Sequence, residues 1–130
     1  MTREHVMIEH MKDPGALREW QRGVLSACVL ATLADGAAHG YAIAQHLHKA
    51  QVGTLKVGIL YPVLNRLEAD ELVYSQWSEG ERGPGRKVFE ITALGRQQLQ
   101  LMRQEWPQFA TAVATLLKAD DPIDANDCHN

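Results

Sequence analysis

Residues 56–91 read KVGILYPVLNRLEADELVYSQWSEGERGPGRKVFEI, and this stretch decides the fold. Its first part, 56–69, is predicted to be an amphipathic helix, because its apolar side chains recur at three- and four-residue steps. The inward positions are Leu60, Val63, Leu64 and Leu67. Its second part has two short β-favouring segments, 73–78 and 88–91, around a loop rich in turn formers, which is typical of a hairpin. Pro62 lacks a backbone donor, so we expect the helix to start around 58–61.

Two further helices are predicted upstream of this stretch. Residues 17–33 place apolar side chains at helical spacing, and Asp35-Gly36 ends that helix. Its repeating positions are Leu17, Trp20, Val24, Cys28 and Ala31. A second, shorter helix is expected after residues 37–40, with Ile43, Ala44 and Leu47 turned inward.

A long helix is predicted after the hairpin, entered at Thr92, whose hydroxyl can cap the first free amides. Its apolar side chains alternate between three- and four-residue steps, which is the pattern of a single coiled-coil seam that needs a partner helix. The seam, which we predict to be the dimer interface, consists of Leu99, Met102, Trp106, Phe109, Val113 and Leu116. Pro107 deletes one helical hydrogen bond at a cost of about 3 kcal/mol, so we expect a kink or a break at Trp106.

The order of three helices, a hairpin and one long helix is that of a winged helix-turn-helix domain, in which the third helix enters the major groove. We therefore predict a mostly α-helical fold with a small β hairpin and a long C-terminal dimerisation helix. The expected parts are an N-terminal extension (1–16), the winged helix-turn-helix DNA-binding domain (17–91), the dimerisation helix (92–118) and an acidic, disordered tail (119–130).

Composition narrows the class of protein. With 130 residues, 45% of them hydrophobic, one core is expected rather than two. The longest apolar run, 24–33, is too short to span a bilayer, and residues 1–12 lack the pattern of a secretory signal, so a cytoplasmic protein with no membrane partner is expected. The formal net charge is −3, so DNA binding must depend on where the cations lie. Cys28 is expected to act as a small buried apolar side chain.

The sequence has no recognisable arrangement for catalysis. It lacks a nucleophile elbow, a phosphate-binding loop and a helical zinc motif. His5 and Glu9, four residues apart, form one weak metal-like pair, for which solvated helix surface is the simpler explanation. The sequence therefore predicts a protein that is not an enzyme and that uses no cofactor and no metal.

The order and spacing of several short motifs between Trp20 and Leu101 resemble the PadR-like family of winged-helix transcriptional regulators. The motifs are His39-Gly40-Tyr41, Gly58-Ile59-Leu60-Tyr61-Pro62 with Leu64, Arg66, Leu67 and Glu68, Leu72-Val73, Gly83-Pro84-Gly85-Arg86-Lys87, and Phe89-Glu90-Ile91-Thr92 with Gly95. The resemblance implies a homodimeric repressor, paired through its C-terminal helix, that leaves DNA when a small molecule or another signal reaches it. The family usually has Thr, Gly and Tyr where this chain has Ile59, Glu71 and Phe89, so no hydroxyl contact to phosphate is carried over to Ile59.

The predicted DNA contacts come from three places. The third helix contributes Lys56, Val57, Gly58, Tyr61, Asn65 and Arg66; the hairpin contributes Arg82, Gly83, Arg86 and Lys87; and the second helix contributes Tyr41. Lysine and arginine meet phosphates, while an amide or a tyrosine hydroxyl can also reach a base edge. Tyr61 is the strongest single candidate, with a half-buried ring packed on the second helix as the alternative. For Tyr41, contact with the DNA backbone and burial in the core are equally open.

The expected partners are double-stranded DNA with an inverted-repeat operator, a second copy of the chain and a candidate small aromatic effector. A sensor dimer is an alternative function, in which Trp20, Trp106 and Phe109 form an aromatic slot between protomers. A winged-helix module that binds proteins is another. Affinity that falls steeply with added salt would distinguish a DNA-binding protein from the latter.

Overall fold

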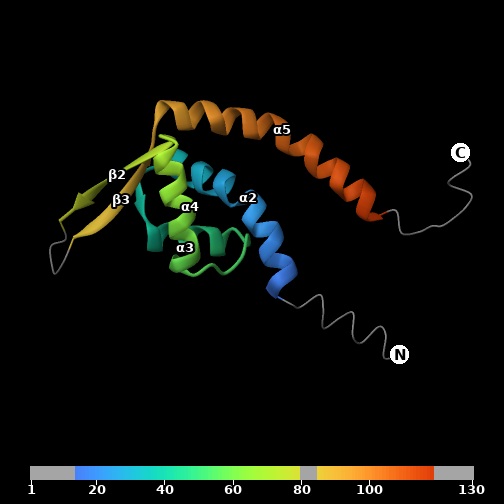
Figure 1. Ribbon diagram of the computed structural model, residues 1–130, viewed down its shortest axis with the longest axis horizontal. Coiled ribbons are helices and arrows are strands. Elements are labelled where there is room, and N and C mark those ends of the chain that lie inside the picture. Colours follow the sequence, from blue (N-terminus) through green and yellow to red (C-terminus); the bar gives the residue numbers. More distant parts are fainter. Residues whose placement is uncertain (1–13, 80–84, 119–130) are drawn as a thin grey trace, which may run out of the picture.

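The computed structural model of the protein describes residues 14–79 and 85–118. The elements are, in chain order, α2 (Pro14–Ala34), β1 (Ala38–His39), α3 (Gly40–Lys49), α4 (Val57–Ala69), β2 (Val73–Ser78), β3 (Arg86–Ile91) and α5 (Ala93–Lys118). The helices α2, α3 and α4 gather into one body, from which the β2–β3 hairpin projects on one side and α5 on the other (Figure 1). The predicted fold class, mostly α with a small β element and a long final helix, is confirmed.

The β element is larger than the expected two-stranded hairpin. It is a three-stranded antiparallel sheet in the order β1-β3-β2, in which Ala38 pairs with Phe89 and His39 with Val88. Residues 37–40, expected only to connect two helices, therefore also add a short edge strand. This strand ties the start of α3 to the hairpin.

One hydrophobic core holds the helices and the sheet together. It contains Leu25, Val29, Leu30, Leu33, Ile43, Ala44, Leu47, Leu55, Leu60, Leu64, Leu67, Val73, Phe89, Ile91 and Leu99. Cys28 packs against this core as expected, and burial raises the pKa of its thiol, which disfavours the reactive thiolate. In the part of the chain that the structure describes, no helix is both long and apolar enough to cross a membrane.

Helix α4 starts one residue earlier than expected and contains Pro62 in its second turn. Lys56 is the N-cap residue, and its carbonyl oxygen accepts the N–H groups of Ile59 and Leu60. Pro62 cannot donate to the carbonyl of Gly58, four residues before it. Since Gly58 and Pro62 are both exposed, water can solvate that carbonyl group, and the helix continues.

A compact junction fixes α5 to the rest of the domain. Helix α4 ends at Ala69, and Glu71, in the turn that follows, has a left-handed backbone (φ 64°) at a position where the family that the sequence resembles usually has glycine. Thr92 Oγ1 accepts the N–H of Gly95 (2.9 Å), as predicted for a cap, and its hydrogen is directed at the carbonyl oxygens of Glu71 (2.8 Å) and Leu72 (3.1 Å). A Cβ atom on Gly95 would overlap the carbonyl oxygen of Leu72 and lie 2.7 Å from Ile91 Cγ1. The first turn of α5 therefore lies directly on the turn between α4 and β2.

Helix α5 is continuous through Pro107, so of the two outcomes expected at Trp106, a kink or a break, the break does not occur. The helix changes direction along its length (Figure 1). Leu99, the first residue of the predicted seam, is 4% exposed in the core of its own chain, and Met102 packs against that core. The later seam positions Trp106, Phe109, Val113 and Leu116 are exposed, so only this part of the seam is free to meet a partner.

Candidate nucleic-acid interface

The solvent-exposed face of α4 is the first component of the candidate site. It carries Gly58, Ile59, Pro62, Asn65 and Arg66, with Lys56 exposed at the helix start. Gly58, Asn65, Arg66 and Lys56 were predicted DNA contacts. Ile59 and Pro62 were not, although they lie on the same face. The face therefore combines an amide, two cations and apolar groups, all of which can meet DNA.

Tyr61 and Val57 were expected on this outer face, and the structure corrects their orientation. Both are only partly exposed and pack against the core. The Tyr61 ring meets Phe89 edge to face, with 6.0 Å between ring centroids, and it lies so close to Gly40 that a Cβ there would be 3.1 Å from the tyrosine hydroxyl oxygen. The structure therefore shows the alternative prediction for Tyr61, a half-buried ring packed on the second helix.

A shallow groove of about 450 Å³ separates the starts of α3 and α4 from the hairpin. Five predicted contact residues border it: Tyr41, Val57, Tyr61, Arg86 and Lys87. Tyr61 therefore borders the groove, although its ring packs against the core and does not project from the helix. Tyr41 is 60% exposed, so its burial in the core is ruled out. Its ring is stacked on His39, with 6.5 Å between centroids.

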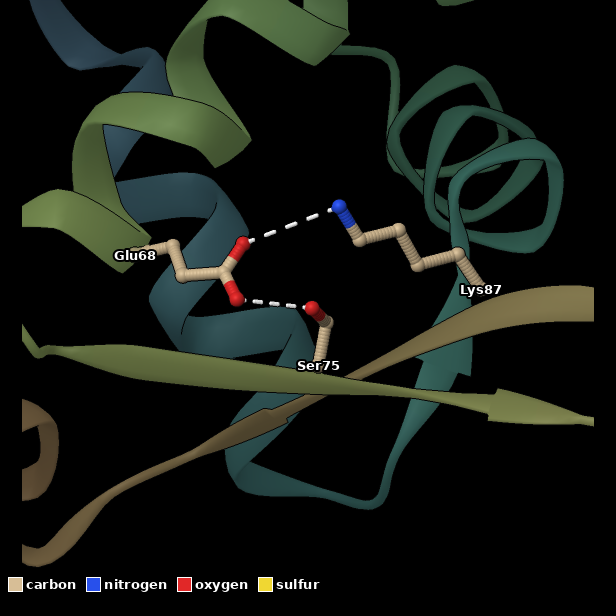
Figure 2. A network of polar contacts seen from close by, with 3 residues as sticks. All are labelled: Glu68, Ser75 and Lys87. Carbon is tan, nitrogen blue, oxygen red and sulfur yellow. Dashed lines mark hydrogen bonds and ion pairs between the residues drawn. The ribbon is translucent and has the colours of Figure 1, made fainter.

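Lys87, one of the hairpin cations, has partners within the chain. Its ammonium nitrogen lies 3.9 Å from Glu68 Oε1 and 5.7 Å from the centroid of the Phe89 ring. The other carboxylate oxygen of Glu68 accepts the hydroxyl hydrogen of Ser75 at 2.7 Å, so one carboxylate connects α4, β2 and β3 (Figure 2). Lys87 therefore lies beside a carboxylate of α4.

Arg86, the second described hairpin cation, reaches sideways to β1. Its Nη1 atom lies 2.9 Å from Nε2 of His39, while Nδ1 of the same imidazole accepts the N–H of Ala42 at 3.2 Å and caps α3. His39 borders the groove together with Gly40 and Trp77, and the tryptophan is 71% exposed. Sequence reasoning missed these three residues as site residues. The His39-Gly40-Tyr41 motif was the available signal for the first two.

The other predicted hairpin contacts, Arg82 and Gly83, lie outside the described residues, as do His5 and Glu9 of the weak metal-like pair. Within the described residues no group of three or more His, Cys, Asp or Glu side chains is placed to hold a metal ion.

Comparison with known proteins agrees with this geometry. Residues 29–101, which hold most of the winged helix and the start of α5, match the transcriptional regulator PadR-like family. The chain belongs to the PadR-like family. Members of this family are transcriptional regulators and not enzymes, as the sequence predicted.

Individual relatives extend the match beyond the family core. The PadR-like chain is similar to a transcriptional regulator of Mycobacterium tuberculosis, with 34% identity over 97 residues that cover 75% of this chain and 89% of that protein. It is also similar to the crystal structure of a PadR family transcriptional regulator from Eggerthella lenta (TM-score 0.73, 28% identity, 87% of this chain and 98% of that chain). A PadR-like transcriptional regulator from Bacillus cereus has a TM-score of 0.67 and 30% identity, over 78% of this chain and 98% of its own.

The predicted effector residues of this PadR-like protein lie on two different helices. On α5, the rings of Trp106 and Phe109 form a tilted pair with 6.3 Å between centroids. Trp20, which lies on α2, is 64% exposed. Of the three residues predicted for an aromatic slot between protomers, the chain therefore brings Trp106 and Phe109 together, and both are exposed.

Proposed function

We propose that this PadR-like protein is a homodimeric repressor that binds an inverted-repeat operator and is released by a signal molecule. The observation that carries the proposal is that Val57 and Tyr61 of α4 and the hairpin cations Arg86 and Lys87 border one groove, while the neighbouring α4 residues Gly58 and Pro62 are exposed. An α-helix fits the major groove of B-DNA, and cations beside it meet the phosphates of the adjoining backbone.

The two parts of the surface have different tasks in this proposal. Asn65 and Arg66 project from the exposed face of α4, so they read base edges, and Ile59 and Pro62 beside them supply apolar contact for a thymine methyl group. Phosphates are bound by the cations at the ends of the surface: Lys56 at the start of α4, and Arg86 and Lys87 on the hairpin.

Dimerisation is assigned to the C-terminal half of α5. Trp106, Phe109, Val113 and Leu116 are exposed large apolar side chains at seam spacing, and Leu117 lies next to them. A two-fold pair of these helices would remove that surface from water. Two α4 helices related by the same axis reach successive major grooves, so the operator half-sites are expected about one helical turn apart, or a multiple of it, in inverted orientation.

Release requires an effector that prefers the dimer whose reading helices are wrongly spaced, since equal affinity for both states shifts nothing. The Trp106–Phe109 pair is the proposed contact for a planar aromatic effector. Fluorescence of Trp106, measured in a protein with Trp20 and Trp77 replaced by Phe, would be titrated with planar aromatic compounds while operator affinity is followed in parallel. Quenching without loss of DNA affinity would contradict this mode of release.

The test of the DNA-binding proposal is selection of bound sites from random duplex DNA with the purified full chain. We expect an inverted repeat to be enriched, and the affinity for it to fall steeply with added salt. Enrichment of a direct repeat would contradict the two-fold dimer. Failure to enrich any site, with no salt-dependent binding to duplex DNA, would overturn the proposal in favour of a protein-interaction module.

A further inference from the structure

His39 connects two elements of the site through the two nitrogens of one ring. It lies on β1 immediately before α3, where Nδ1 accepts the backbone N–H of Ala42 and caps that helix (3.2 Å). On its other side Nε2 lies 2.9 Å from Nη1 of Arg86 on β3. The ring stacks on Tyr41 and borders the groove between the reading helix and the hairpin.

The cap determines where the ring carries its proton. An Nδ1 atom that accepts a hydrogen bond has no hydrogen of its own, so the imidazole is neutral and its hydrogen is on Nε2. The guanidinium of Arg86 has N–H donors and no acceptor. The 2.9 Å contact therefore brings two donors together, and they cannot hydrogen bond to each other while the cap is intact.

Two N–H groups held this close are both satisfied when one acceptor that each can reach accepts from the two of them. A phosphate oxygen suits this arrangement, because it has several lone pairs and a negative charge that pairs with the guanidinium. Water could accept from both groups in the free protein, but it brings no charge. The pair lies beside the groove, on the hairpin side of α4.

We propose that His39 and Arg86 together bind one oxygen of a DNA backbone phosphate, with His39 as a neutral Nε2–H donor. This inference rests on the proposed DNA-binding function and adds to it a specific residue, which was not among the predicted contacts. In this proposal the hydrogen bond that caps α3 has a second role. Because Ala42 N–H donates to Nδ1, the ring hydrogen stays on Nε2, the nitrogen beside Arg86 that donates to the phosphate.

The first test is spectroscopic and requires no DNA. Nitrogen-15 chemical shifts of the histidine rings in the full chain distinguish the Nε2–H tautomer from the Nδ1–H tautomer. We expect His39 to be in the Nε2–H form. The Nδ1–H form would overturn the proposal, since Nε2 would then accept directly from Arg86 and no further acceptor would be needed.

The second test measures duplex DNA affinity for His39→Asn, Arg86→Ala and the double variant. Asparagine is a good helix cap, so His39→Asn retains the fold while its shorter side chain withdraws the second donor. We expect about tenfold weaker binding for Arg86→Ala, a smaller loss for His39→Asn, and a double variant that loses less than the product of the two, because both act on one phosphate.

His46→Asn, in the last turn of the same helix, is the matched control and is expected to bind as the wild type does. Urea unfolding of each variant separates a loss of stability from a loss of affinity. Wild-type affinity in His39→Asn, or strictly multiplicative losses, would overturn the phosphate pair. Absence of DNA binding by the wild-type protein would instead overturn the proposed function.

Discussion

Replacing Glu68 with Gln is predicted to tighten binding to DNA. In the free protein the Glu68 carboxylate lies 3.9 Å from the ammonium of Lys87 and accepts a hydrogen bond from Ser75 (Figure 2). A glutamine carbonyl oxygen can still accept from Ser75, so the substitution removes the charge and leaves that hydrogen bond in place. Lys87 is then free to meet a phosphate, and an acid is removed from the reading helix.

The size of the effect follows from the distance and the exposure of the pair. Two unit charges about 4 Å apart interact by about 1 kcal/mol in water. Since both side chains are about one third exposed (32% and 35%), solvent screens the pair, and measured pairs of this kind contribute about 0.2–1 kcal/mol. Glu68→Gln is therefore expected to lower the Kd for duplex DNA by up to about fivefold.

The assay is fluorescence anisotropy of a labelled duplex, with operator and random sequence measured at the same salt concentration. Both affinities are expected to rise, because a phosphate contact carries no sequence information. Asp70→Asn, which removes a nearby exposed acid, controls for net charge and is expected to have a smaller effect. Unchanged or weaker binding by Glu68→Gln, or the same gain in a Lys87→Met background, would refute the reasoning.

Three further substitutions test other parts of the molecule. Gly95→Ala is expected to lower the free energy of unfolding, measured in urea, by about 1–3 kcal/mol, because the added methyl overlaps packed backbone. Gly23→Ala, on open helix surface, is expected to stabilise the protein by about 0.5–1 kcal/mol. Equal effects of the two substitutions would contradict the close packing of Gly95 on the turn after α4. Trp106→Asp is expected to sediment as a monomer and Gln104→Asp as a dimer; a dimeric Trp106→Asp would exclude α5 pairing through this residue. Asn65→Ala is expected to lose about 1–3 kcal/mol of operator affinity and little affinity for random duplex, and equal losses would remove it from base reading.

Helical periodicity predicted the order of the elements, because the buried faces of α2, α3 and α4 repeat at 3.6 residues. It placed Leu60, Leu64 and Leu67 of α4 in the core correctly, but it misplaced two other residues of that helix. Val57 and Tyr61 were placed outward, but their side chains fill the space between α4, Gly40 and Phe89, so the exposed face is centred on Pro62. The sequence alone does not decide whether a tyrosine faces outward or is half-buried, since its ring favours burial and its hydroxyl favours water.

The sequence patterns could not predict contacts between distant parts of the chain. The two residues of β1 are too few to show an alternating pattern, and their partners on β3, Phe89 and Val88, lie far along the chain. The same holds for Lys87 with Glu68 and for Arg86 with His39, which are 47 positions apart. The hairpin cations were predicted as phosphate contacts, and the sequence did not show that Lys87 lies beside Glu68 and Arg86 beside His39.

The division of α5 into two halves explains how a signal could reach the reading helices. Its first half is part of the winged helix: Leu99 is in the core, and Thr92 and Gly95 lie on the turn that follows α4. Its second half carries the exposed apolar side chains, and Pro107, which lies between the halves, removes one backbone hydrogen bond. Under the proposed function, a change in pairing of the second half would reach the winged helix through the contacts of Thr92 and Gly95 with the turn after α4. In this proposal the effector would change the spacing of the two α4 helices and would leave the groove of each protomer as it is.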